Sequence, residues 1–284
     1  MNGLAEHRRF FAEELEAVCG LRTPALVDAF ASVPREAFLP PGPWLIRSET
    51  DYLTGTPRHT PDANARRVCH NIAVAIDPAR QLFNGVPSLL GLCIDRLELQ
   101  SGQRVLHVGC GLGYYSAVMA RCVGATGRVV AVEVDEQLAA SAREKVGSLP
   151  NVAVECGDGN ESRDETFDSI LVNCGVTHPL PVWLDAIRPG GRMILPLTAT
   201  MPQMGNVGKG PLLLLTRRES DFEVTLVTIV AIYSAVGIRD AAANEQIGRA
   251  LMKGQFPRLN RLRRDRHDES PDCWLHGTGF CLSA

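Results

Sequence analysis

The sequence predicts an α/β fold: a doubly wound, mostly parallel seven-stranded sheet of the Rossmann-like kind, with an N-terminal helical cap and a C-terminal extension. Two observations predict this fold. From about residue 87, short apolar strands alternate with helices, as in a parallel sheet that is buried on both faces. A glycine-rich turn joins the first of these strands directly to a helix, which is typical of doubly wound sheets that bind nucleotide-like ligands.

The N-terminal cap consists of two expected helices and an irregular segment. Apolar residues recur at helical spacing over 4–19 and again over 24–33, where the second helix ends at the Val33-Pro34 turn. Residues 39–68 hold five prolines and many polar residues without any period, which predicts a long loop or lid.

The alternating region predicts the core of the fold. In chain order we expect a helix at 88–98, a strand at 104–108, a helix at 114–123, a strand at 128–134, a helix at 135–147, strands at 152–156 and 167–173, a short helix near 181–187 and a strand at 191–197.

Two longer apolar runs, 211–216 and 224–233, flank the polar turn RRESDF and predict an antiparallel hairpin that closes one sheet edge. Residues 240–284 predict a helix and then an irregular, Arg-rich end. The expected domains are the cap with its lid (1–86), the cofactor-binding domain (87–238) and the C-terminal extension (239–284).

Composition restricts the classes of partner. The 284 residues are 45% hydrophobic and 21% charged, as in a globular protein, and the formal net charge of −3 favours neither nucleic acid nor an acidic membrane as partner. Nine scattered cysteines without a CxxC pair indicate reduced thiols. The charged N-terminus is unlike a signal peptide, and no apolar run has the length of a membrane span. We therefore expect a cytoplasmic protein without membrane attachment.

The glycine turn predicts an S-adenosylmethionine (SAM) site. Glycines between a strand and a helix let the backbone turn tightly and approach a ligand. Glu133 closes the next strand, where a carboxylate can accept hydrogen bonds from two ribose hydroxyls, and Asp158 follows the third strand, where it can receive an adenine amino group. The expected cofactor-binding residues are Gly109, Cys110, Gly111, Gly113, Glu133, Asp158 and Gly159.

Two alternatives to SAM fit parts of this pattern. A dinucleotide site calls for GxGxxG, whose helix-terminal amides face a pyrophosphate, whereas Gly109, Gly111 and Gly113 follow GxGxG, which suits the phosphate-free SAM. The second alternative is that the glycines only shape a turn and the acidic residues are solvated strand ends. The complete constellation in order favours SAM.

The sequence resembles the protein-L-isoaspartate O-methyltransferase family from about residue 8 to 235. The likeness lies in the segments SVPREAFLP (32–40), VLHVGCGLGYYSAVMA (105–120), NVAVECGDG (151–159), FDSILVNCGV (167–176) and WLDAIRPGGRMILPL (183–197). The resemblance implies a SAM-dependent enzyme whose methyl acceptor is an aspartyl or isoaspartyl carboxylate of a peptide or protein.

Three departures from the family pattern concern the acceptor side. The family places an I-S-x-P segment before the first core helix, and here Gly85 stands at the position of its serine. His107 replaces the acid that opens the glycine motif, and residues 70–85 replace the family's usual glycine-rich approach. Asn84, Ser88 and His178 are therefore the catalytic candidates, the last because it follows the fourth strand at its carboxyl end.

Carboxyl methylation needs no strong base, because a carboxylate is already ionised at neutral pH and the enzyme mainly aligns it with the methyl group. Repair of damaged aspartyl residues and tailoring of one peptide both fit, and the departures favour a specialised substrate. Two alternatives stay open: an N- or S-methyltransferase acting on a small molecule or RNA, and a SAM-binding module without catalysis.

Other features have plainer explanations. His107 is expected to be a hydrogen-bonded core residue, and Cys110 a small side chain beside the cofactor rather than a nucleophile. The spacing of Cys273, His276 and Cys281, with His267 nearby, allows zinc ligation, but without a second clean pair we predict no metal site. The Arg-rich run at 258–266 could hold an acidic peptide or RNA, but a solvated helix face is expected.

Overall fold

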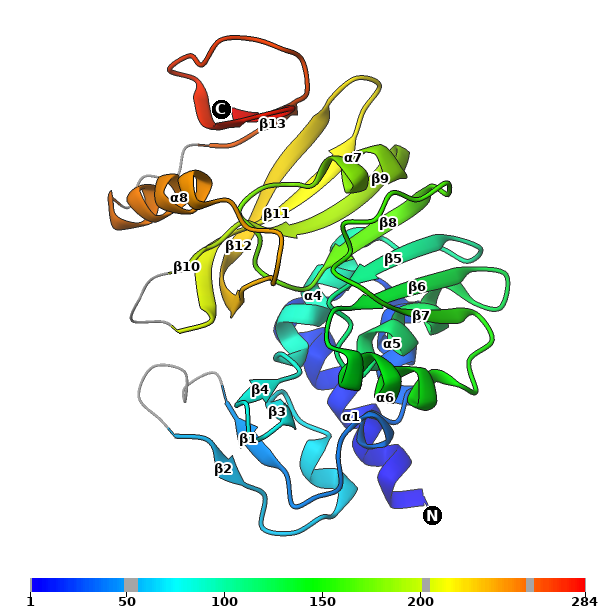
Figure 1. The fold of residues 1–284 in the computed structure, drawn as a ribbon. Coiled ribbons are helices and arrows are strands. Elements are labelled where there is room, and N and C mark those ends of the chain that lie inside the picture. The colour runs from blue at the N-terminus through cyan, green and yellow to red at the C-terminus, as the bar shows by residue number, and fades with distance from the viewer. Residues whose placement is uncertain (1, 49–55, 201–204, 254–257, 284) are drawn as a thin grey trace. The chain divides into compact units, whose positions relative to one another are not determined.

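The computed structural model describes residues 2–48, 56–200, 205–253 and 258–283, and the chain forms two compact units (Figure 1). Unit 1 comprises Met1–Gln103 and Cys110–Cys156, and unit 2 comprises Arg104–Gly109 and Gly157–Ala284. The domain boundaries expected after residues 86 and 238 remain predictions.

Unit 1 begins with the two expected helices, α1 (Asn2–Cys19) and α2 (Pro24–Ser32). Proline suits the first turn of α2, where its missing N–H costs no hydrogen bond. The helices bury Phe11 and Phe30, whose rings meet edge to face with centroids 6.1 Å apart. A short 3₁₀ helix, η1 (Arg35–Phe38), follows. The predicted cap helices are confirmed.

A small antiparallel sheet corrects the prediction of a long irregular lid over 39–68. Its strands lie in the order β2-β1-β3-β4, and η2 precedes β3. Their bounds are β1 (Leu45–Arg47), β2 (Arg58–His59), β3 (Ala73–Asp77), β4 (Leu82–Phe83) and η2 (Ala65–Val68). Strands of two to five residues are too short to show a period, but Trp44, Val68 and Val74 form a small apolar core. Residues 49–55 of the expected lid lie outside the described residues.

The rest of unit 1 follows the prediction closely. It consists of α4 (Pro87–Leu97), α5 (Tyr114–Val123), β6 (Arg128–Glu133), α6 (Glu136–Val146) and β7 (Val152–Cys156). β6 and β7 pair in parallel. Asp135 caps α6, because its carboxylate accepts hydrogen bonds from the amides of Gln137 and Leu138.

Unit 2 contains a mixed sheet whose strand order is β14-β15-β13-β12-β11-β9-β8-β5. β5, β8 and β9 are parallel, whereas the pairings from β9 through β11 to β14 are antiparallel. The strands are β5 (Arg104–Val108), β8 (Phe167–Val172), β9 (Ile187–Pro196), β10 (Ala199–Thr200), β11 (Val207–Arg217), β12 (Phe222–Tyr233), β13 (Arg261–Arg263), β14 (Cys273–Gly277) and β15 (Phe280–Ser283). The helices are α7 (Pro181–Ala186) and α8 (Ala241–Lys253).

The C-terminal part of unit 2 differs from the prediction in two ways. The expected hairpin forms as β11 and β12, but it does not close the sheet, since β13 pairs with β12 and β15 and β14 follow. The described end of the chain is thus not irregular, and within the Arg-rich run Arg261–Arg263 form a strand instead of the expected helix face. These strands of three to five residues are again too short to show a period. Among the described residues, unit 2 alone places eight strands in this order, more than the seven expected for the whole fold.

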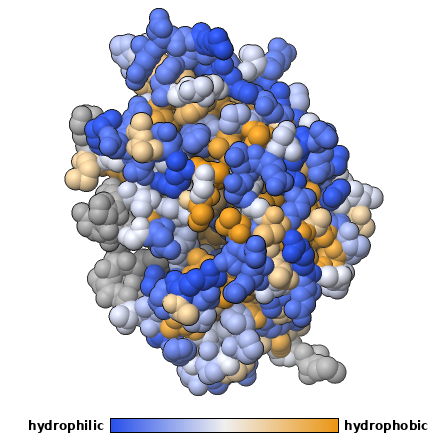
Figure 2. Space-filling model, viewed as in Figure 1, coloured by the Kyte–Doolittle hydropathy of each residue, from blue (hydrophilic) through white to orange (hydrophobic). Residues whose placement is uncertain are grey.

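The described helices include none with the length and apolarity needed to cross a membrane. On the face shown in Figure 2, the surface is mostly hydrophilic.

Candidate active site

The glycine turn of unit 1 leads into α5 through residues that only glycine fits well. Gly111 and Gly113 have φ values of +56° and +85°, in the left-handed region that other residues rarely adopt. A Cβ atom at Gly113 would lie 3.1 Å from Val146, and one at Gly111 would lie 3.3 Å from Ile76. The turn is therefore packed closely from both sides, as the sequence predicts for a backbone that approaches a ligand.

Glu133 lies against this turn. Its Oε2 accepts a hydrogen bond from the amide of Gly111 at 2.7 Å, and its Oε1 accepts one from the amide of Asp135 at 3.1 Å. Only 8% of Glu133 is exposed. A carboxylate has about four acceptor positions, so two are left to receive ribose hydroxyls. The structure thus brings together the glycine turn and the acidic residue that the sequence assigned to the same ligand.

The β3–β4 hairpin covers the glycine turn within unit 1. Ile76 of β3 contacts Gly111, and Arg80, in the hairpin loop, pairs with both Asp77 and Asp135. The Arg80 guanidinium holds the pKa of the Asp135 carboxyl below its usual value. The ion pair between Arg80 and Asp135 therefore attaches the hairpin two residues from Glu133. Residues 70–85, in which the family pattern is altered, thus lie beside the predicted cofactor-binding residues of unit 1.

Arg35 organises the chain that leads into this hairpin. Its side chain is fully buried, and its guanidinium donates to the carbonyl oxygens of Val68 (3.0 Å), His70 (3.1 Å) and Ile72 (2.7 Å) and to Oδ1 of Asn84 (3.2 Å). Arg35 was not among the predicted site residues, although it belongs to the VPRE segment. Its place in a segment that carries the family resemblance was the available signal.

Asn84 has a structural role as well as its predicted catalytic one. Besides the Arg35 bond, its Oδ1 accepts the amide of Val74 at 3.0 Å, which joins β3 to the residue after β4. Its Nδ2 is buried and has no hydrogen-bond partner among the described residues.

The neighbouring segment is built around Gly85. This residue has φ +77°, and a Cβ atom there would lie 3.0 Å from Leu90. Ser88, the other candidate from this segment, lies in the first turn of α4, where its amide donates to Oδ1 of Asn71 at 2.8 Å. The catalytic roles of Asn84 and Ser88 remain predictions.

In unit 2, Gly109 directly follows the strand β5 and has φ +79°. A Cβ atom on Gly109 would lie 3.2 Å from the carbonyl oxygen of Asn173, and Asn173 Nδ2 donates to the Gly109 carbonyl at 3.2 Å. The start of the glycine motif is therefore held by the residue that follows β8.

The loop that carries Asp158 is fixed by contacts within unit 2. Oδ1 of Asp158 accepts the amide of Asn160 at 2.9 Å, and Trp183 Nε1 donates to the carbonyl of Gly159 at 2.8 Å. Gly159 is tightly packed, since a Cβ atom there would lie 2.9 Å from Val108. Sequence analysis missed Trp183, although it opens one of the segments that carry the family resemblance.

His178 follows β8 and faces the C-terminal extension. Its ring stacks on Phe280 with centroids 5.9 Å apart, and its Nδ1 lies 3.0 Å from Oγ1 of Thr177. Burial lowers the pKa of His178, against the opposing influence of Asp240. The ring is therefore neutral at pH 7, and when the Thr177 hydroxyl donates to Nδ1, Nε2 carries the proton.

His107 lies in the core, as expected, and Cys110 lacks the character of a nucleophile. His107 is fully buried in β5, and burial lowers its pKa to about 3, so the ring is neutral at physiological pH. Burial raises the pKa of the Cys110 thiol far above its usual value. A thiol that stays protonated is not a nucleophile.

Comparison with known proteins identifies a family. The sequence profile described as protein-L-isoaspartate(D-aspartate) O-methyltransferase matches residues 59–228. A protein-L-isoaspartate O-methyltransferase from Methylorubrum extorquens is 33% identical over 221 residues, which cover 76% of this chain and 82% of the relative. One from Thermotoga maritima is 39% identical over 115 residues, but these cover 39% of this chain and only 36% of the relative.

A solved structure gives the same fold. It is a Plasmodium falciparum protein described as a protein-L-isoaspartate O-methyltransferase, in complex with S-adenosyl-L-homocysteine. It superposes with a TM-score of 0.59 at 16% identity and covers 80% of this chain and 97% of its own. At this identity the likeness supports the fold alone.

Proposed function

The chain belongs to the protein-L-isoaspartate(D-aspartate) O-methyltransferase family, and we propose that it methylates the carboxylate of an isoaspartyl or aspartyl residue in a specialised peptide or protein. It is a SAM-dependent methyltransferase, as its family is. The single observation that supports the proposal best is the built cofactor side of unit 1, in which Glu133 and the glycine turn are joined by a 2.7 Å hydrogen bond.

The residues of unit 1 fit SAM. Gly111 and Gly113 allow the tight turn, since a Cβ atom at either would crowd Ile76 or Val146, and the nearly buried Glu133 keeps acceptor positions for ribose hydroxyls. When bound, SAM supplies a methyl group activated on a sulfonium. For Gly109, Asp158 and Gly159 of unit 2 we propose the cofactor-binding part that the sequence predicts, in which Asp158 receives the adenine amino group.

The acceptor side needs orientation rather than proton removal. The acceptor carboxylate is ionised at neutral pH, so alignment and exclusion of water account for most of the catalysis. The neutral His178, with a proton on Nε2, can donate a hydrogen bond to one carboxylate oxygen. Asn84 Nδ2 and the hydroxyl of Ser88 are the corresponding donors that we propose in unit 1.

The Gly85 segment supports a specialised substrate. At the position where the resemblance places a serine, the backbone adopts φ +77° beside Leu90, a conformation and a space that suit glycine. The segment is thus built without that serine. This supports tailoring of a particular peptide over general repair.

Labelled SAM and three matched peptides test the proposal. The peptides differ at one position, which is isoaspartyl, aspartyl or asparaginyl, and the enzyme is the full chain. We expect label on at least one of the two acidic peptides and none on the asparaginyl peptide. The label should be lost in mild alkali, because methyl esters hydrolyse there.

The two alternatives give different results. Label that survives mild alkali would reject the ester and favour transfer to nitrogen or sulfur. SAM binding by calorimetry without turnover on any acceptor would instead favour a binding module.

Replacing His178 with Ala should raise KM or lower kcat for the acidic peptide while leaving the Kd for SAM unchanged.

A further inference from the structure

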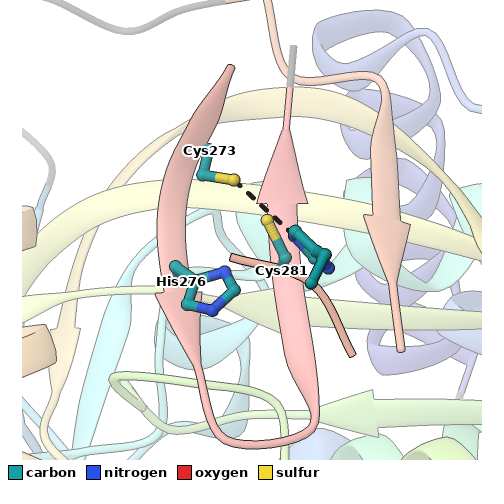
Figure 3. A group of neighbouring side chains, drawn as sticks. Cys273, His276 and Cys281 are labelled. Carbon is teal, nitrogen blue, oxygen red and sulfur yellow. Dashed lines mark hydrogen bonds between the residues drawn. The ribbon is translucent and has the colours of Figure 1, made fainter. Parts of the chain in front are cut away.

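Four potential metal ligands converge in the C-terminal extension, and none of them is among the residues assigned to methyl transfer. His267, Cys273, His276 and Cys281 each offer one ligand atom, and these atoms all lie within 4.8 Å of one another. Cys281 is buried and the other three are partly buried. In Figure 3, Cys273, His276 and Cys281 point toward one another from two neighbouring strands.

The hairpin of β14 and β15 places three of these side chains on one face. His276 lies directly opposite Cys281 in the antiparallel register, so both project to the same side. Cys273 lies opposite Ser283, which is two residues from Cys281 and so shares its face.

A β-bulge makes this arrangement possible. Cys273 and His276 are three residues apart, and regular alternation would send them to opposite faces. The register shifts between Cys273 and Leu275, and the extra residue returns Cys273 to the face of His276. The carbonyl of the intervening Trp274 accepts a hydrogen bond from Gln246 of α8 at 2.6 Å, which anchors the bulge.

His267 completes the group from the segment between β13 and β14. Its Nδ1 lies 3.0 Å from the backbone carbonyl of Asp265, and because a carbonyl only accepts, Nδ1 carries the proton. Its other ring nitrogen, Nε2, then faces Cys273, whose Sγ is 3.7 Å away. Metal-binding histidines usually donate their other N–H to such a carbonyl or carboxylate.

His276 supplies a second, independent indication of a ligand. Its Nδ1 is enclosed and has no hydrogen-bond partner among the described residues. A buried polar atom without a partner is costly, and a bound metal ion in the cluster would resolve this.

We propose that His267, Cys273, His276 and Cys281 form a structural zinc site. Two sulfurs and two imidazoles are a usual tetrahedral ligand set for Zn²⁺, and two thiolates neutralise its charge. Zinc bonds of about 2.0–2.3 Å separate the ligand atoms of a tetrahedron by roughly 3.3–3.8 Å. The 3.7 Å between Cys273 Sγ and His267 Nε2 lies in this range, so small side-chain adjustments close the site.

The site explains how such short strands remain folded. β13, β14 and β15 have three, five and four residues, and their apolar core includes Leu262, Leu275 and Leu282. Hydrophilic residues cover much of this part of the surface, at the top of Figure 2. Metal binding adds stability where apolar burial is limited. It also ties down the polar segment between β13 and β14.

The sequence analysis predicted no metal site, because only one Cys/His pair had a recognisable spacing. His267 lies six residues before Cys273, and no spacing rule places its Nε2. The fold brings His267 to the cluster, and the bulge turns Cys273 to the same face as His276 and Cys281. We therefore propose a metal site in place of the absence expected from the sequence.

Metal analysis of the full chain tests the proposal. After expression with added zinc and dialysis against metal-free buffer, we expect about one zinc ion per chain by mass spectrometry. Cys281→Ser and His276→Phe should each retain less than about a fifth of this amount, whereas His276→Cys should keep it, since three cysteines and one histidine also hold zinc. Cys156→Ser, at an exposed cysteine outside the cluster, is the matched control and should match the unaltered chain.

Cobalt gives a readout that does not depend on a folded variant. The unaltered chain loaded with Co²⁺ should show the visible absorption of tetrahedral cobalt thiolates, and added zinc should abolish it. A chain with no zinc and no such absorption would overturn the proposal, as would equal zinc in Cys281→Ser. A Cys273–Cys281 disulfide in the non-reducing mass spectrum of the chain as purified would also overturn it. None of these measurements depends on methyl transfer.

Discussion

Arg35 Nη2 donates a hydrogen bond to Asn84 Oδ1 at 3.2 Å, and through this bond the VPRE segment is connected to the residue that precedes Gly85. The same carboxamide oxygen accepts the amide of Val74. Arg35 also spans three carbonyl oxygens before β3. A buried charge of the cap thus supports the hairpin over the glycine turn from within.

Replacing Arg35 with Met should therefore destabilise unit 1. The variant leaves buried carbonyl oxygens without donors, and we expect a loss of about 3 kcal/mol or more in the free energy of unfolding. Urea denaturation followed by circular dichroism measures it. Arg66→Met, at an exposed arginine of η2, is the control and should change the free energy by less than about 0.5 kcal/mol. Equal midpoints for the two variants would contradict the supporting role of Arg35.

Glu133→Gln should weaken SAM binding. One carboxylate oxygen now accepts from the amide of Gly111 and the other from that of Asp135, but the NH₂ group of glutamine cannot accept either bond. The ribose also loses a charged acceptor. We expect the Kd for SAM to rise about tenfold or more, which calorimetry measures. Glu136→Gln, at the exposed first residue of α6, should leave the Kd unchanged. An unchanged Kd in Glu133→Gln would remove this residue from the cofactor site.

Restoring the family's serine should not improve this enzyme. Gly85→Ser forces a non-glycine residue into φ +77° and places its Cβ 3.0 Å from Leu90. We expect a loss of about 1–2 kcal/mol in the free energy of unfolding and no gain in kcat on isoaspartyl peptides. Gly3→Ser, at an open position of α1, is the stability control. Higher kcat in Gly85→Ser would show that the segment retains the family's usual acceptor geometry.

His107 should make stability depend on pH. Its pKa of about 3 in the folded chain lies below the ordinary value of 6.5. At pH values between 3 and 6.5 the unfolded chain therefore binds a proton at this ring that the folded chain does not bind. The neutral His107 ring therefore lets the folded chain keep its full free energy of unfolding above pH 6.5, and this free energy declines as the pH falls towards 3. At pH 5 the loss relative to pH 7.5 is about 2 kcal/mol.

Urea denaturation at the two pH values checks this. His107→Phe should lose about 2 kcal/mol less than the unaltered chain between pH 7.5 and pH 5. His59→Phe, at an exposed histidine of β2, should show the same pH dependence as the unaltered chain. Parallel profiles for the His107 variant would indicate that the ring is accessible to protons in the folded protein.

Much of the fold was predictable where the chain repeats a period. β5, β7 and α5 have the predicted bounds, because continuous apolar strands and a glycine turn mark their ends clearly. The pairing of Glu133 with the glycine turn also followed from order along the chain, since consecutive strand ends of a parallel sheet share one edge.

The missed features depend on contacts between distant segments. The strands β1 and β2 are only three and two residues long, and the pairing that defines them joins residues far apart in sequence. Arg35 and Trp183 act through backbone carbonyl oxygens, which leave no pattern of side chains in the sequence. The metal cluster depends on a bulge, and a one-residue shift of register cannot be predicted from spacing.

The division of the chain into two units has a consequence for synthesis. The strand β5 belongs to unit 2, although the residues before and after Arg104–Gly109 belong to unit 1. Unit 1 is therefore complete only when Cys156 has left the ribosome, and β5 must wait for residues beyond Gly157 before it gains its parallel partner β8, which in turn pairs with β9. Neither unit can be obtained by cutting the chain once. A nascent or truncated chain that ends near residue 156 leaves the apolar strand β5 without β8 beside it, and exposed strand edges of this kind make incomplete chains prone to aggregation.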